Sequence, residues 1–317
     1  MKVLLTGATG FVGGHTLAAL AARGHEVTCL VRAPSADRLK ASARQVIGDV
    51  LGDMLGDVLG DAPGGVPGDA TRPRGLAEAM AGMHAVVHLV GIIRELPAKG
   101  VTFERLHVEA TRNVILAARE AGVRRIVHMS ANGARPEAPS RYHRTKWAAE
   151  ELVRGSGLAY TIFRPSIIFG PGDSFVSLLA GILRRAPVVP VVGDGRYQLQ
   201  PVAVATVAAG FSLALEKEAA LARSFEVGGP DRLTYDAVLD TVAEALGRRP
   251  PLKLHLPVAP LRLLARALSR FPWFPLTPDQ ITMLLAGNTC DAAPFYQTFG
   301  LTPVPFSAAS LSYLQKA

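Results

Sequence analysis

The sequence predicts an α/β fold, a doubly wound parallel sheet with a smaller C-terminal lobe, and three observations support it. An apolar strand at 2–6 runs into a glycine-rich turn, and a helical pattern follows at 15–23. Strand and helix patterns then alternate, as βαβ units require. From Pro165 onward the alternation loosens and prolines become more frequent. We therefore expect one domain over 1–164, and over 165–317 mostly a lobe with returns to the sheet.

Each expected element is an apolar run of suitable length or an amphipathic segment. Gly24 and Gly122 follow two of the expected helices, where glycine commonly ends a helix. The expected strands are 2–6, 26–31, 44–47, 85–90, 125–129 and 159–164, and the expected helices are 15–23, 76–80, 103–121 and about 142–154.

One segment, 48–61, interrupts this alternation with a tandem repeat of Leu-Gly-Asp. A calcium-binding β-roll would need a longer array of such repeats. Loops tolerate added residues at little cost. We therefore expect an insertion in a surface loop at about 50–68.

Composition excludes several classes of protein. The chain has 317 residues and is 49% hydrophobic, which is ample for a hydrophobic core. Its formal charge is +8. Its basic residues are scattered rather than blocked or interleaved with aromatics, so no nucleic-acid partner is expected. Cys29 and Cys290 form neither a disulfide framework nor a metal cluster. No signal peptide or membrane-spanning run is recognised, and a cytoplasmic location without a metal is expected.

The first turn carries the clearest chemical signal. Gly7, Gly10 and Gly13 form a G-x-x-G-x-x-G pattern between a strand and a helix. The first glycine permits the tight turn, the second lets a pyrophosphate approach the backbone, and the third lets the helix pack on the strand. Free N–H groups at the helix start attract the anion. This pattern predicts a Rossmann-type domain that binds a dinucleotide.

A second signal is the pair Tyr142 and Lys146, one helical turn apart and therefore on one helix face. A free phenol has a pKa near 10. We expect the neighbouring ammonium to lower the pKa of Tyr142. The pair could then exchange a proton with a carbonyl or an alcohol beside a nicotinamide. We predict that Tyr142 and Lys146 are the catalytic residues.

These motifs, with others along the chain, resemble the extended short-chain dehydrogenase/reductase superfamily, whose members include epimerases. The stretches that carry the resemblance are 6–14, 86–91, Tyr142-x-x-x-Lys146, 164–173, 193–195, 201–202 and 227–230. Within the superfamily the chain most resembles the atypical branch that includes the NAD(P)-binding accessory subunit of respiratory complex I. The segments 89–95, 144–150 and 276–284 point to that branch.

The resemblance implies roles for individual residues around the cofactor. The pyrophosphate turn comprises Gly7, Thr9, Gly10, Phe11, Val12 and Gly13. Asp49 and Val50 are implied at the adenine, although 68–73 also resembles that family segment. The remaining cofactor-binding residues implied are Leu89, Val90, Gly91, Ser130, Tyr142, Lys146, Pro165 and Ile167.

Arg32 ends the second strand, where NAD-preferring relatives usually carry an acidic residue for the ribose 2′-hydroxyl. An arginine suits a 2′-phosphate, so NADP is expected in preference to NAD. The alternative is an exposed arginine just past the end of a strand.

Three positions depart from the family pattern. Ala131 falls where relatives carry a serine or threonine that orients the substrate oxygen, although a one-residue shift would place Ser130 there. His107 stands near a common asparagine, and we expect it to be a helix-surface or capped residue. The segment 202–206 lacks the His and Asp of relatives. These departures leave turnover open.

Two functions are therefore carried forward. The first is an NADP-dependent oxidoreductase or epimerase-like enzyme acting on a small molecule such as a sugar nucleotide, a quinone, or a steroid-like or flavonoid-like ring. The second is a non-catalytic NAD(P)-binding protein used for assembly, scaffolding or redox sensing. The basic, amphipathic segment 260–273 is compatible with a lobe helix, a protein partner, or a peripheral position at the inner face of a membrane.

Overall fold

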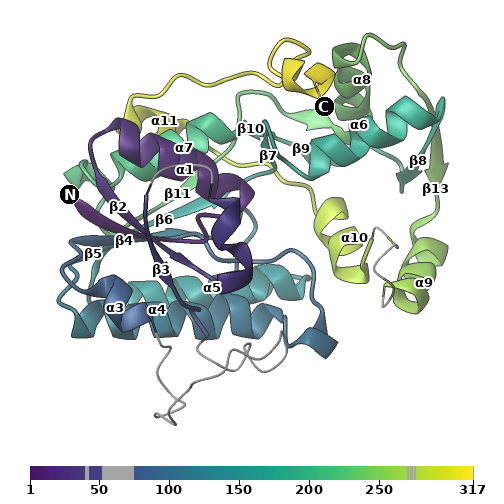
Figure 1. Cartoon of the computed structure of the whole chain (residues 1–317). Coiled ribbons are helices and arrows are strands. Elements are labelled where there is room, and N and C mark those ends of the chain that lie inside the picture. Colours follow the sequence, from purple (N-terminus) through teal and green to yellow (C-terminus); the bar gives the residue numbers. More distant parts are fainter. Residues whose placement is uncertain (40–42, 52–74, 270, 272–273, 275, 317) are drawn as a thin grey trace.

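A parallel β-sheet forms the centre of the molecule. The computed structural model describes residues 1–39, 43–51, 75–269, 271, 274 and 276–316, so the Leu-Gly-Asp repeat and the expected insertion lie largely outside the described residues. Among these residues the central sheet has seven strands in the order β11-β6-β5-β4-β1-β2-β3 (Figure 1). The strands are β1 (Lys2–Thr6), β2 (Glu26–Val31), β3 (Arg44–Ile47), β4 (Ala85–His88), β5 (Arg125–Met129), β6 (Ala159–Pro165) and β11 (Arg223–Val227).

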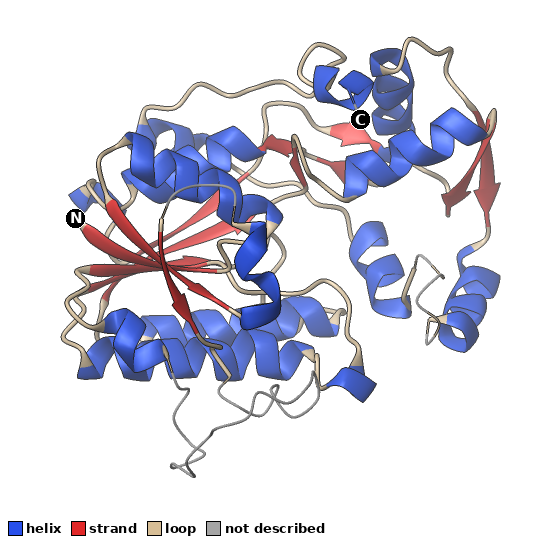
Figure 2. Cartoon of the chain, viewed as in Figure 1, coloured by secondary structure: helices blue, strands red, loops and turns tan. Residues whose placement is uncertain are grey.

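Every neighbouring pair in this sheet is parallel, for example Val3 opposite Val27 and Val127 opposite Thr161. Parallel strands need crossover helices, which cover both faces. The predicted doubly wound α/β architecture is therefore confirmed. The strand β11, from the second half of the chain, completes one edge (Figure 2).

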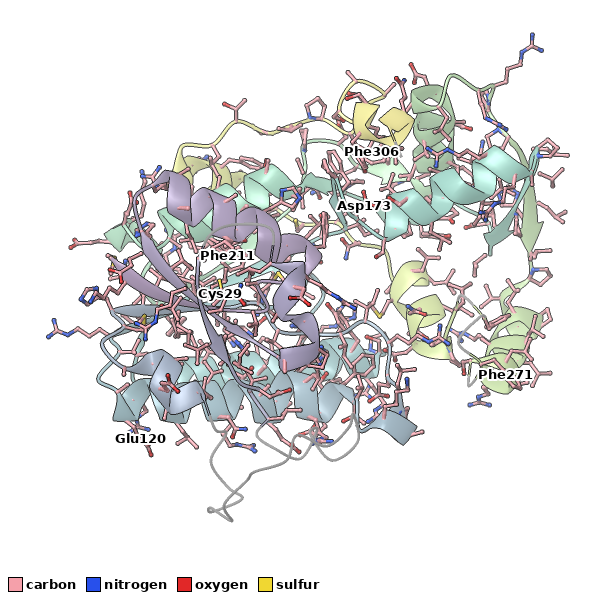
Figure 3. All side chains as sticks on the ribbon, viewed as in Figure 1. Cys29, Glu120, Asp173, Phe211, Phe271 and Phe306 are labelled. Carbon is pink, nitrogen blue, oxygen red and sulfur yellow. The ribbon has the colours of Figure 1, made fainter. Side chains whose placement is uncertain are left out.

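Two layers of helices cover the sheet, one on each face, because its strands are apolar on both faces. On one face lie α1 (Phe11–Ala22), α7 (Val204–Leu213) and α11 (Ala293–Phe299), over a core that includes Cys29 and Phe211 (Figure 3). On the other face lie α3 (Leu76–Met80), α4 (Ala110–Glu120) and α5 (Arg141–Arg154).

The remaining elements form the lobe, whose own core includes Phe169, Val238 and Leu311. Three small two-stranded sheets accompany its helices in the described residues. The strands are β7 (Ile168–Phe169), β8 (Val188–Val192), β9 (Gln198–Leu199), β10 (Val202–Ala203), β12 (Leu233–Thr234) and β13 (Leu252–Leu256), and the helices are α6 (Phe175–Arg185), α8 (Tyr235–Ala245), α9 (Val258–Leu268) and α10 (Pro278–Leu285).

Two helices differ from the sequence expectation. The helix expected at 15–23 begins four residues earlier, at Phe11, directly after the glycine turn. The single helix expected at 103–121 opens with a π-helical segment, Glu104–Glu109, before α4 begins. None of the described helices has both the length and the apolar character needed to cross a membrane.

Candidate nucleotide-binding and catalytic site

The glycine turn has the backbone geometry that its sequence predicts. Gly7 has a positive φ of 81°, which favours glycine. A Cβ on Gly13 would lie only 2.0 Å from the carbonyl oxygen of Gly7, so only glycine fits there. Helix α1 follows Gly10 with no side chain capping its first turn. Its first N–H groups therefore remain suited to an anion.

A cleft of about 210 Å³ opens beside this turn, at the carboxyl ends of β1, β2, β3 and β4. Such a position is where open α/β sheets bind ligands. Nine residues predicted for the cofactor line it, namely Gly7, Thr9, Gly10, Arg32, Asp49, Val50, Leu89, Val90 and Gly91. The sequence did not single out six further lining residues, namely Thr6, Leu30, Val31, Gly48, Ile92 and Leu106. Most of these six adjoin predicted residues at strand ends, whereas Leu106 enters from the π-helical segment.

The cleft residues fit a dinucleotide. Arg32 is exposed immediately after β2. Asp49 accepts a hydrogen bond from the Leu51 amide (2.9 Å), and the Val50 carbonyl accepts one from Asn113 Nδ2 (2.9 Å). These bonds hold the chain after β3 against α4. The absence of side chains at the glycine turn leaves the room that a pyrophosphate needs beside the backbone.

Other predicted residues lie outside the lining of this cleft. Val12 and Gly13 pack inside the start of α1, and Phe11 stacks edge-on with His15. Ser130 is buried after β5, and its hydroxyl has no hydrogen-bond partner among the described residues. Pro165 ends β6, and the Ile167 amide donates to Asn288 Oδ1 (2.9 Å).

Lys146, one of the predicted catalytic pair, lies beside the cleft. Its side chain is 2% exposed, and Nζ donates to the Met129 carbonyl at 3.0 Å. A Cβ on Gly91 would lie 2.8 Å from this ammonium, so Gly91 leaves the space that Lys146 occupies beside the cleft. Burial lowers the pKa of Lys146 to about 8, and the nearby carboxylate of Glu150 partly opposes that change.

Tyr142 lies one turn before Lys146 and is surrounded by rings. Phe103, His107 and His143 contact it edge-on, with ring centroids 5.2–5.8 Å apart. Burial raises the pKa of Tyr142 to about 12. Our expectation that the ammonium lowers this pKa is therefore wrong for the cofactor-free protein. Desolvation of the phenolate sets the direction of this shift, because three rings pack against the partly buried Tyr142.

His107 is also not the helix-surface residue that we expected. It lies within the π-helical segment, is 1% exposed, and stacks on Phe103. Its Nδ1 hydrogen-bonds with Thr145 Oγ1 (2.8 Å), and its Nε2 lies 3.1 Å from the Ile92 carbonyl. Burial lowers its pKa to about 2, so the ring is neutral at pH 7. His107 thus joins helix α5 to the loop that follows β4, residues 89–96, which we call the cleft loop.

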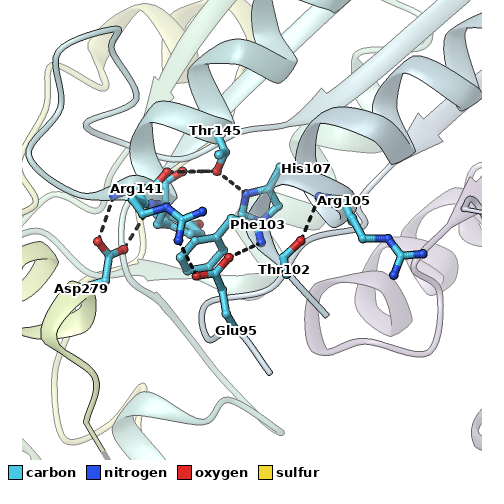
Figure 4. A network of polar contacts seen from close by, with 9 residues as sticks. Glu95, Thr102, Phe103, Arg105, His107, Arg141, Thr145 and Asp279 are labelled. Carbon is cyan, nitrogen blue, oxygen red and sulfur yellow. Dashed lines mark hydrogen bonds and ion pairs between the residues drawn. The ribbon is translucent and has the colours of Figure 1, made fainter. Parts of the chain in front are cut away.

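The lobe contacts the start of helix α5, which carries Tyr142 and Lys146. Asp279 of α10 accepts hydrogen bonds from the amides of Arg141 (2.9 Å) and Tyr142 (3.2 Å), as Figure 4 shows. Glu95 of the cleft loop pairs with the Arg141 guanidinium (3.1 Å). A carboxylate at the N-terminus of a helix accepts hydrogen bonds from free N–H groups and interacts favourably with the positive end of the helix dipole. The contacts span 46 to 138 positions, so local sequence patterns give no signal for them.

Arg94 makes a second connection from the cleft loop to the lobe. Its guanidinium donates to the carbonyls of Ser269 (2.8 Å), Phe271 (3.1 Å) and Phe274 (2.8 Å). Arg94 therefore binds the segment between α9 and α10. Together with Asp279, it fixes this part of the lobe to the loop and helix that carry the candidate site.

The glycine turn, the cleft at the strand ends and the buried lysine define a dinucleotide-binding protein of the Rossmann class. A family model described as the NAD dependent epimerase/dehydratase family matches residues 3–228. The chain therefore belongs to this family, within the extended short-chain dehydrogenase/reductase superfamily.

Known proteins agree with this assignment. The mitochondrial NADH dehydrogenase (ubiquinone) 1 alpha subcomplex subunit 9 of Arabidopsis thaliana is 30% identical over 284 residues, 87% of this chain and 66% of that protein. The ceramide reductase of Caulobacter vibrioides is 32% identical over 61% of this chain and 54% of that protein. The chain thus spans less than two thirds of each. The expected likeness to the complex I accessory-subunit branch is confirmed.

Solved structures support the fold. MoeE5 in complex with UDP-glucose and NAD has a TM-score of 0.73 at 22% identity, over 100% of this chain and 98% of that one. The UDP-glucose 4-epimerase of Thermotoga maritima has a TM-score of 0.72 at 17% identity, over 100% and 98%.

Proposed function

We propose that the protein is an NADP-preferring oxidoreductase or epimerase-like enzyme in which Tyr142 and Lys146 transfer a proton. One observation carries this proposal. The Lys146 ammonium packs against Gly91 of the nucleotide cleft and lies one helical turn from Tyr142. A proton donor and a cation thus adjoin the place where the strand ends would hold a dinucleotide.

The protonation states favour the direction of reduction. A nicotinamide dinucleotide, when bound, supplies or accepts the hydride. Tyr142, with its pKa raised to about 12, is protonated at neutral pH as an ordinary tyrosine is, so its phenol can donate to a substrate oxygen. Lys146, with a pKa of about 8, is mostly charged at pH 7 and can donate to ribose hydroxyls. A cation near the phenol would also stabilise the phenolate left behind.

Turnover is tested by following NAD(P)H oxidation with sugar nucleotides, quinones, and steroid-like and flavonoid-like ketones. We expect one class to be reduced, and Tyr142→Phe to lower the rate by roughly 10²–10⁴-fold because the proton donor is lost. Full activity in Tyr142→Phe would refute the role of this residue.

Arg32 supports the preference for NADP. Its exposed guanidinium lies on the lining of the cleft, immediately after β2, where it could reach a 2′-phosphate. Fluorescence titrations should give tighter binding of NADPH than of NADH, and Arg32→Ala should remove the difference. Arg38→Ala, a second exposed arginine after β2, is the matched control. Equal affinities in the wild type would overturn the preference.

A second candidate function is a non-catalytic NAD(P)-binding assembly, scaffold or redox-sensing protein. The observation that favours it is Ala131, which is buried after β5 where relatives carry a hydroxyl, and the likeness to a complex I subunit agrees. If the protein binds a dinucleotide but reduces none of the substrate classes, this second function is supported. For either function we propose a nucleotide-binding domain over 1–164 and, over 165–317, mostly a lobe with returns to the central sheet, of which β11 is one. The buried, free Cys29 and Cys290 support a reducing, cytoplasmic setting.

A further inference from the structure

The end of the lobe farthest from the central sheet exposes an apolar sheet face (Figure 1). Strands β8 and β13 pair with Val188 opposite Leu252 and Pro190 opposite Leu254. Paired residues share one face, so these four side chains lie together. Leu252 is 70% exposed, Leu254 54% and Val188 39%. The opposite face packs on the lobe core. A face of this kind is uncommon on an isolated soluble domain.

Helix α9, which follows β13 in the chain, also exposes apolar side chains. Among its residues only Ala265 is buried, while Leu263 is 69% and Leu264 45% exposed. Ala259, Arg262, Leu263 and Arg266 follow i, i+3, i+4, i+7 spacing and therefore share one helix face. With Val258 of α9 and Pro278 and Thr282 of α10, they line a groove of about 700 Å³. The helix thus presents leucines and arginines together.

The stretch of sequence that forms β13 and α9 carries positive charges only. Between Ala245 and Pro278 the sequence has no Asp or Glu and six basic residues, namely Arg248, Arg249, Lys253, Arg262, Arg266 and Arg270. Two of them are engaged within the lobe, Lys253 with Asp240 and Arg248 with the Leu183 carbonyl. The arginines of α9 line the groove instead.

We propose that the β8–β13 face and α9 dock on an anionic lipid bilayer. Exposed leucines of an interfacial helix enter the boundary between headgroups and acyl chains, while arginines bind lipid phosphates and keep their charge in water. A second copy of the chain would bring like charges together, which disfavours self-association through this face. The proposal does not depend on turnover, so it can fail while the proposed enzyme stands.

The test is cosedimentation of the full chain with vesicles of phosphatidylcholine alone or mixed with phosphatidylglycerol. We expect binding that requires phosphatidylglycerol and weakens as salt is raised. Each basic residue near such a surface contributes roughly fivefold in affinity, so Arg262→Glu/Arg266→Glu should weaken binding by at least about tenfold. Leu252→Asp/Leu263→Asp should do the same because the apolar contact is lost.

Matched controls lie on α4, where Arg112→Glu/Arg119→Glu and Leu116→Asp make the same changes at exposed positions. These controls should bind vesicles as the wild type does, and all variants should keep dinucleotide affinity and thermal stability. Absence of vesicle binding, equal binding to neutral vesicles, or equal loss in the α4 controls would overturn the proposal. So would a dimer in the wild type that Leu252→Asp/Leu263→Asp dissociates, since that outcome assigns the face to a second copy.

Discussion

Replacing the buried Lys146 by methionine should stabilise the cofactor-free protein while it weakens nucleotide binding. The side chain is 2% exposed, and burial lowers its pKa from 10.5 to about 8. Methionine has a similar length without a charge, so Lys146→Met removes the cost of the buried ammonium. The same change removes the cation that we place beside the cleft.

The pKa of Lys146 sets the size of the effect. The fall from 10.5 to about 8, at about 1.4 kcal/mol per unit of pKa, corresponds to a cost of about 3 kcal/mol when the lysine is charged in both states. Lys146→Met also leaves the Met129 carbonyl without its donor, and this loss offsets about 1–3 kcal/mol of the stabilisation. We therefore expect Lys146→Met to be about 1 kcal/mol more stable than the wild type at pH 7.

The dependence on pH is the sharper signature. Between pH 8 and 10.5 the unfolded chain binds more protons at this lysine than the folded chain does, so wild-type stability rises with pH. Lys146→Met lacks this group. From pH 7 to 9.5 the wild type should gain about 2 kcal/mol relative to the variant.

Urea unfolding at the two pH values measures both quantities. Lys253→Met, at a lobe lysine paired with Asp240, is the control and should cost at most about 1 kcal/mol. A variant that is several kcal/mol less stable at pH 7, with a difference independent of pH, would refute the reasoning.

Three further predictions concern the contacts around the site. Arg94→Ala removes three hydrogen bonds to carbonyls between α9 and α10, so the opening free energy of α10 should fall by about 2 kcal/mol and its amides should exchange faster; unchanged exchange would contradict this prediction. Asp279→Ala leaves the first amides of α5 without their acceptor and should cost about 1 kcal/mol in urea unfolding; a wild-type midpoint would show that the cap contributes nothing. Arg164→Ala removes two hydrogen bonds (2.8 and 2.7 Å) from the fully buried Glu150, which keeps its ion pair with Arg154, and should cost about 2 kcal/mol. In a double-mutant cycle Arg164→Ala/Glu150→Ala should cost less than the sum of the singles, and additivity would argue against coupling.

Most of the sheet was predictable from local patterns because its strands are short apolar runs bounded by polar residues. The strands at 2–6, 26–31, 44–47 and 125–129 agree with β1, β2, β3 and β5. The glycine turn was also predictable from local sequence, because each glycine is required by the backbone conformation or the close contacts at its own position.

Features that depend on distant residues were not predictable. The apolar spacing of 103–121 fits a helix, but it does not distinguish α-helical from π-helical hydrogen bonds in Glu104–Glu109. The pKa of Tyr142 depends on rings brought together by folding, so the residue pattern suggested the wrong direction. Asp279 and Arg94 contact partners about 140 to 180 positions away, and nothing in their local sequence signals those contacts.

Isothermal titration of NADPH and NADH into the wild type and Gly13→Ala tests the central claim most directly. A Cβ at Gly13 would lie 2.0 Å from the Gly7 carbonyl oxygen, so this variant cannot keep the turn that faces the pyrophosphate. Gly181→Ala, at a glycine within helix α6 whose Cβ would meet nothing within 4 Å, controls for the general effect of the substitution. The account predicts one saturable site in the wild type and in Gly181→Ala, and loss of binding in Gly13→Ala. A wild-type protein that binds neither dinucleotide would contradict it.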